Sequence, residues 1–160
     1  MCWTTNFPEL AAPKTAKKPI KVYKVCKKRP NSDIIMSYYM NHEYKVGKTY
    51  QMDADFEVID YDEVEPTRPY YEINAGFHSY NHEKTKVKVT YHYNGDNRKL
   101  IEVLFGYQNC GIDYFKVSNY DTIDIVRVEC TIPEGSTYYE NANGEIVSNA
   151  ITIDSITSIE

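Results

Sequence analysis

Apolar and polar residues alternate most regularly near the C-terminal end of the chain. From Val126 to Ile132 every second residue is apolar, which is the period of a strand with one buried face. Pro133 and Gly135 follow; proline lacks a backbone donor and glycine adopts positive φ easily, so a tight turn is predicted there. A second apolar stripe is formed by Val147, Ile151 and Ile153. The two stripes predict the core sheet of the domain.

Three earlier stretches also predict strands. Residues 20–28 are apolar on both faces, as in a central strand, and Lys24 falls on the same face as Ile20, an unusual place for an ammonium group. Residues 70–80 predict a strand interrupted at Gly76. Alternation over 87–93, then Asn94-Gly95 and the apolar run 100–107, predicts a hairpin. Helical spacing within 100–107 is the alternative, and 34–40 fits either strand or helix.

The remaining stretches lack a clear period. Residues 1–19 contain three prolines and a basic cluster, which predicts an extended, poorly anchored arm; the alternative is that Cys2 and Trp3 pin it to the body. Residues 44–50 predict an irregular edge or loop, 53–65 a solvated acidic loop, and 108–124 a loop with a short helix or edge strand. We therefore expect residues 20–160 to form one α+β domain dominated by antiparallel strands, with few short helices.

Composition narrows the classes of function. A chain of 160 residues is long enough for one domain with its own core. Its 16 tyrosines suit either the half-buried surfaces of a β-rich core or a recognition surface. The formal net charge of −5 argues against nucleic-acid binding, which depends on cationic neutralisation of phosphates.

The cysteines and the hydropathy pattern suggest the compartment. The four cysteines form no CxxC pair and no zinc-ligand spacing, so we expect no metal site and reduced thiols. Cys26 and Cys130 lie within predicted strands, as free core thiols do. The sequence shows no signal-peptide pattern and no apolar run approaching a membrane span, so we expect a soluble cytoplasmic protein without membrane contact.

Candidate catalytic residues are few. The sequence patterns of P-loops, dinucleotide-binding turns, zinc peptidases and α/β-hydrolases are absent. His78 and Ser79 resemble a base and a nucleophile, but neighbours on a strand point to opposite faces and cannot serve each other; a hydrogen-bonded buried histidine is the simpler interpretation. Glu145 follows Gly144 at a strand entrance, where it could stabilise a developing cation in a cleft or be an exposed turn residue.

Several blocks resemble a family of small uncharacterised bacterial and phage proteins. The blocks are IKVYKV, YKVGKTY, GFHSY, CTIPEGSTYY and GEIVSNAITI. The resemblance covers most of the chain from Ile20 to Ile153, and it implies no particular activity.

The chain order of Lys24, Ser79 and Glu145 also resembles, more distantly, the ADP-ribosyltransferase fold. That resemblance implies NAD as cofactor, with Glu145 stabilising the ribosyl cation, Ser79 orienting the nicotinamide ribose and Lys24 neutralising phosphate. His78 would be a further catalytic candidate and Tyr23 a further cofactor contact. A lysine stands where that fold has arginine or histidine, and it cannot make the same forked contacts with phosphate.

These observations favour a small non-enzymatic accessory protein, of bacterial or phage origin, that binds a protein or small-molecule ligand without a cofactor. Tyrosine side chains would supply the recognition surface. The alternatives are an ADP-ribosyltransferase-like enzyme that uses NAD, and a structural or virion-associated subunit that pairs through strand edges.

Overall fold

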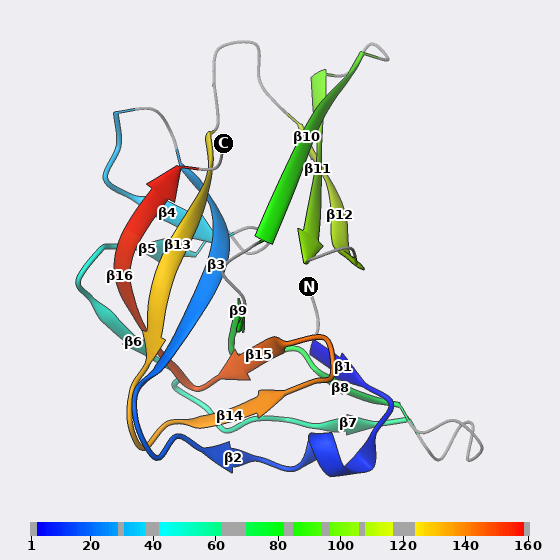
Figure 1. Ribbon diagram of the computed structural model, residues 1–160, viewed down its shortest axis with the longest axis vertical. Coiled ribbons are helices and arrows are strands. Elements are labelled where there is room, and N and C mark those ends of the chain that lie inside the picture. Colours follow the sequence, from blue (N-terminus) through cyan, green and yellow to red (C-terminus); the bar gives the residue numbers. More distant parts are fainter. Residues whose placement is uncertain are drawn as a thin grey trace.

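The structure is a computed structural model in which antiparallel β-sheets dominate (Figure 1). The residues that it describes are 3–28, 31–37, 42–61, 70–81, 85–93, 97–105, 108–116 and 124–158. Their side chains are described up to residue 81 and from 126 to 157. The described strands form one 10-stranded sheet and two 3-stranded sheets.

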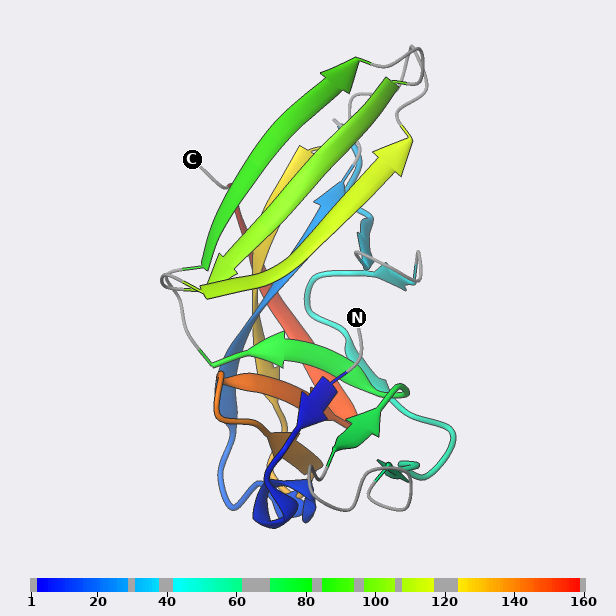
Figure 2. The same cartoon turned by 90° about the vertical axis from the view of Figure 1, so that its right-hand side faces the viewer.

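The centre of the large sheet consists of β3 (Ile20–Lys28), β13 (Asp124–Ile132) and β16 (Ala150–Ser158). The middle strand, β13, pairs antiparallel with both neighbours, so Val128 lies between Lys24 and Ile156. The predictions of strands over 20–28 and 126–132 are confirmed. Figures 1 and 2 show these three long strands twisting together along the molecule.

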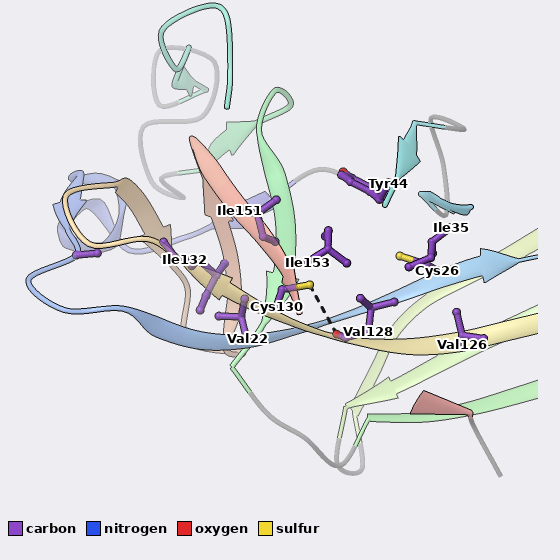
Figure 3. Packing of buried hydrophobic residues seen from close by; sticks show 12 residues of the cluster. Val22, Cys26, Ile35, Tyr44, Val126, Val128, Cys130, Ile132, Ile151 and Ile153 are labelled. Atoms are coloured by element: carbon purple, nitrogen blue, oxygen red, sulfur yellow. Dashed lines mark hydrogen bonds between the residues drawn. The ribbon is translucent and has the colours of Figure 1, made fainter. Parts of the chain in front are cut away.

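Alternate side chains of these strands form the main core (Figure 3). The apolar residues predicted on β13 are all buried, with Val128, Cys130 and Ile132 at 0% exposure. Val22 and Cys26 from β3 belong to the same cluster, as do Ile151 and Ile153 from β16. The opening strand and the two closing strands therefore share one interior, as their alternation predicts.

On one side of β3 the sheet continues with four short strands, β2 (Lys14–Thr15), β14 (Thr137–Glu140), β15 (Glu145–Ser148) and β9 (Phe77–Tyr80). Their order is β2-β14-β15-β9, and β9 then joins β3. Successive residues of β15 face opposite sides, so Ile146 enters the main core while Val147 packs with Trp3, Ile73 and Tyr139 in a second core. Strand β15 thus connects the two cores.

The first residues of the chain belong to the fold, and the prediction of a poorly anchored arm is wrong for residues 3–16. Strand β1 (Trp3–Thr5) pairs with β8 (Tyr71–Ile73), which pairs with β7 (Ile59–Asp60). A 3-10 turn, η1 (Pro8–Ala11), then leads to β2. Trp3 is only 1% exposed, and burial of so large an aromatic ring holds the segment in place.

Short strands border the large sheet where the sequence lacks a clear period. Strand β4 (Ile35–Ser37) pairs with β3 and with β5 (Glu43–Tyr44), and β6 (Thr49–Gln51) pairs with the start of β16. Residues 34–40, which fit either strand or helix, are therefore a strand over Ile35–Ser37, and 38–40 lie outside the described residues.

A separate 3-stranded sheet contains β10 (Thr85–Tyr93), β11 (Asn97–Phe105) and β12 (Gln108–Lys116). The predicted hairpin is confirmed by the antiparallel pairing of β10 with β11. The segment 108–124, predicted to be a loop with a short helix or edge strand, contains an edge strand, β12, which pairs with β11 alone; residues 117–123 lie outside the described residues. Since η1 is the one helical element of the described residues, the α+β expectation is corrected to a mainly β fold.

Candidate functional site

Lys24 is a buried ammonium group in the main core. It is 7% exposed and lies on β3 between Val22 and Cys26, two residues of the main core. Its Nζ donates a hydrogen bond to the backbone carbonyl of His78 and lies 5.5 Å from the centre of the Tyr44 ring. No carboxylate in the described part of the chain pairs with it. A carbonyl dipole and an aromatic face therefore stabilise its charge.

Ser79 lies beside Lys24 on the neighbouring strand. Tyr23 pairs with Tyr80 between β3 and β9, and one step along this antiparallel register Lys24 lies opposite Ser79. Ser79 is 1% exposed, and its Oγ has no hydrogen-bond partner among the described residues. The structure thus brings two of the predicted site residues together, in the interior of the protein.

Glu145 lies on the other face of the sheet. It pairs with Tyr80, which pairs with Tyr23, and residues directly opposite in antiparallel strands project to the same side. Lys24 follows Tyr23 and Ser79 precedes Tyr80, so both project to the opposite side of the sheet. The sheet separates Glu145 from them, and the three residues do not line one cleft. This geometry gives no support to the dinucleotide site implied by the distant resemblance.

Glu145 instead joins the N-terminal segment to the β14–β15 turn. Asn141 donates through Nδ2 to Glu145 Oε2 (3.2 Å) and to the carbonyl of Thr4 (3.0 Å). The carbonyl of Glu145 accepts a hydrogen bond from Trp3 Nε1 at 2.9 Å. Burial raises the pKa of Glu145, although the bond from Asn141 acts in the other direction. The carboxylate thus bonds to the same Asn141 amide that holds Thr4, and this gives it a structural role.

His78 remains a neutral imidazole near neutral pH. Burial and, secondarily, the positive charge of Lys24 lower its pKa from 6.5 to about 4. Its Nε2 lies 3.3 Å from the carbonyl oxygen of Asn74. His78 pairs with Val147 while Ser79 pairs with Ile146, two residues that face different cores, so His78 and Ser79 point apart as their adjacency predicts.

The core thiols are not suited to nucleophilic chemistry. Cys26 and Cys130 are both free and buried. Burial raises the pKa of Cys26 to about 11 and that of Cys130 to about 12, so both remain protonated at neutral pH. Cys130 donates a weak hydrogen bond to the carbonyl of Val128 at 3.8 Å, drawn as the dashed line in Figure 3. Their expected role as small core residues is confirmed.

A cluster of aromatic rings and lysines extends from Lys24 to the surface, and sequence patterns did not predict it. We call it the aromatic–lysine cluster; its members are Lys24, His42, Tyr44, Lys48, Tyr50 and Phe77. The ring of Tyr44 is at the centre, with centroid distances of 4.7 Å to His42, 5.0 Å to Tyr50 and 6.4 Å to Phe77. The first and second of these contacts are edge-to-face, an arrangement that aromatic rings prefer.

The aromatic–lysine cluster becomes more exposed towards its outer end. Tyr44 is 3% exposed, Tyr50 and Phe77 are half-buried, and His42 is exposed. The exposed Lys48 places Nζ 5.5 Å from the centre of the Tyr50 ring, whose hydroxyl accepts a hydrogen bond from the backbone N–H of Lys45 at 2.7 Å. The cluster therefore presents ring surfaces and positive charge to solvent from a base fixed in the core.

Metal ligation finds no support in the part of the chain that the structure describes. There, no group of three or more His, Cys, Asp or Glu side chains could hold a metal ion. Of the predicted acidic loop 53–65, residues 62–65 lie outside the described residues. No helix among the described residues is long and apolar enough to cross a membrane. No protein-family model, curated protein or solved structure matches this chain.

Proposed function

We propose that this protein is a non-catalytic binding protein and that its protein or small-molecule ligand contacts the aromatic–lysine cluster. The supporting observation is the gradient of exposure in this cluster, from buried Tyr44 through half-buried Tyr50 and Phe77 to exposed His42. Aromatic side chains that are held rigidly and remain partly exposed lose little entropy on binding and often dominate binding energy.

The proposed ligand carries an anionic group next to an aromatic or apolar part. Lys45 and Lys48 are exposed at the turn between β5 and β6, and Val46 between them is 48% exposed. This local positive charge contrasts with the net charge of −5 for the whole chain. An anionic ligand is therefore attracted to this turn and repelled by much of the remaining surface.

The candidate catalytic residues give less support to an enzymatic function than the aromatic–lysine cluster gives to binding. Glu145 is separated from Lys24 and Ser79 by the sheet, and the two described thiols are protonated. Binding requires only the surface that the cluster offers, and the proposal needs no cofactor.

The test is a titration of the isotope-labelled full chain with phenyl phosphate, followed by NMR. We expect saturable shifts at Lys48, Tyr50 and Phe77, and weaker binding of both benzyl alcohol and inorganic phosphate, each of which has half of the proposed chemistry. Lys48→Ala should weaken phenyl phosphate binding about 2- to 5-fold, which corresponds to the roughly 0.5–1 kcal/mol of an exposed cation–π or charge contact.

Lys21→Ala is the matched control. Lys21 is also an exposed lysine, and its ion pair with Glu129 at 3.5 Å lies on the central strands. The Lys21→Ala variant should bind phenyl phosphate as tightly as the parent protein does. Equal binding of the three probes, or an equal loss in both lysine variants, would show that the aromatic–lysine cluster is not the binding surface.

A further inference from the structure

A polar pocket of about 260 Å³ lies on a different part of the surface. It forms where the turn after β13 meets the end of β6 and the junction between β15 and β16. We call it the Asn149 pocket; the lining residues that concern us are Gln51, Met52, Pro133, Glu134, Ser136 and Asn149. Its volume is below the roughly 300–1,000 Å³ of pockets that bind drug-sized ligands, so a smaller ligand fits.

Asn149 is fixed in position by its own hydrogen bonds. Its backbone N–H donates to the carbonyl of Thr137 (3.0 Å), its carbonyl accepts from the N–H of Met52 (2.8 Å), and its Oδ1 accepts from the N–H of Thr137 (2.9 Å). These contacts determine the orientation of the side-chain amide. Its Nδ2 has no partner among the described residues, so a preorganised donor remains at the pocket.

The opposite wall, formed by the turn from Pro133 to Ser136, is also rigid. Gly135 has φ +86, Ser136 N–H donates to the carbonyl of Pro133 (3.1 Å), and Gly135 N–H donates to the carbonyl of Ala16 (2.8 Å). The N–H of Ala16 in turn donates to the carbonyl of Ser136 at 2.9 Å. The turn is therefore clamped by the N-terminal segment, and the pocket does not have to be organised by its ligand.

The free side-chain groups of the pocket can both donate and accept hydrogen bonds. The amide of Gln51, the hydroxyl of Ser136 and the carboxylate of Glu134 have no side-chain partner among the described residues. Met52 and Pro133 add apolar surface. Glu134 is the charged member of the lining and is exposed. Its carboxylate therefore repels an anion, and it stabilises a bound cation by only about 0–1 kcal/mol.

We propose that the Asn149 pocket binds a neutral polyhydroxylated ligand with the size of one sugar ring. Ring hydroxyls both donate and accept, so they complement the amide nitrogen of Asn149, the amide of Gln51 and the carboxylate of Glu134 together. Met52 and Pro133 suit the C–H surface of such a ring. This site is independent of the aromatic–lysine cluster, because Tyr50 and Gln51 are neighbours on β6 and project to opposite faces.

The experiment is an NMR titration of the full chain with D-glucose, D-galactose and N-acetyl-D-glucosamine, up to about 100 mM because a small polar site gives millimolar affinity. We expect at least one sugar to shift the amides of Gly135, Ser136 and Asn149 saturably. Glu134→Ala and Gln51→Ala change exposed side chains and should each weaken binding about 3- to 10-fold, the loss expected for one hydrogen bond.

Glu57→Ala, which removes another exposed carboxylate, is the control and should leave sugar binding unchanged. L-argininamide and sulfate serve as charged probes. The proposal is overturned if no sugar shifts these amides, if the shifts map elsewhere, or if either charged probe binds at this pocket more tightly than the sugars. None of these outcomes depends on phenyl phosphate binding, so the two proposals can fail separately.

Discussion

Gly76 offers the sharpest test of the packing around the candidate site. It precedes β9 and has φ +123. A Cβ at this position would lie 2.6 Å from Cγ2 of Val147 and 2.9 Å from Cε1 of Phe56, and Val147 is fully buried in the second core. Gly76→Ala therefore combines an unfavourable backbone conformation with a steric overlap.

The two contributions can be separated by comparison with Gly47. Positive φ for alanine costs about 1–3 kcal/mol, and overpacking of a filled core costs about 1–3 kcal/mol. We expect Gly76→Ala to lower the free energy of unfolding by roughly 2–6 kcal/mol. Gly47 has φ +85, and its added Cβ would meet nothing within 4 Å, so Gly47→Ala should cost only the backbone part, about 1–3 kcal/mol.

Urea unfolding monitored by tryptophan fluorescence measures both variants, because the chain has one tryptophan, Trp3, and it is buried in the second core. Adding Val147→Ala to Gly76→Ala should cost less than the sum of the single changes, since it removes one overlapping methyl group. If Gly76→Ala is no less stable than Gly47→Ala, or if the double variant shows no coupling, the close approach of β9 to β15 is incorrect.

Three further predictions concern stability. Trp3→Ala should cost about 3–5 kcal/mol in urea unfolding followed by circular dichroism, which does not need the lost tryptophan, because a fully buried indole is removed; a loss near zero would mean that the N-terminal segment is a free arm. Burial lowers the pKa of His78 from 6.5 to about 4, so as the pH falls the histidine is protonated in the unfolded chain before it is protonated in the folded one. The free energy of unfolding should therefore fall as the pH decreases from 6.5 to 4, by up to about 3 kcal/mol. His78→Gln should remove this pH dependence. Burial raises the pKa of Glu145, so its contribution to stability is greatest in acid and declines as pH rises; Glu145→Gln should therefore melt higher than the parent protein at neutral pH, and equal melting temperatures there would contradict the assignment.

The strands could be predicted where the local pattern matches the final environment. Residues 126–132 alternate because β13 has one face in the main core, and Asn94-Gly95 indicates the β10–β11 hairpin by its turn preference alone. The segment 1–19 shows no such pattern, because β1 is only three residues long and contributes a single side chain, Trp3, to the second core. Trp3 packs 5.8 Å from the ring of Tyr139, a contact that depends on the complete fold and has no local signal.

The contacts of the candidate site depend even more on the complete fold, and local sequence patterns do not predict them. The sequence places Lys24 on an apolar face, but its hydrogen-bond acceptor is the carbonyl of His78, 54 residues away. Similarly, His42, Tyr44 and Tyr50 are close in the sequence, whereas Phe77 reaches them only because β9 lies beside β3. Motif comparison could select Lys24, Ser79 and Glu145 by chain order, but only the register shows that Glu145 faces the other side.

The buried Lys24 and the exposed aromatic rings are best understood together. An ammonium group in a core is costly unless its donors find acceptors, and here Tyr44 and the His78 carbonyl compensate for that cost. The compensation fixes Tyr44, because moving its ring would leave the charge of Lys24 without its aromatic partner. Tyr44 in turn packs edge-on against His42 and Tyr50, so the outer rings rest on a base that the core charge holds in position. A recognition surface supported in this way is organised before its ligand arrives, which makes the position of Lys24 in the core a property of the binding surface as well as of the fold.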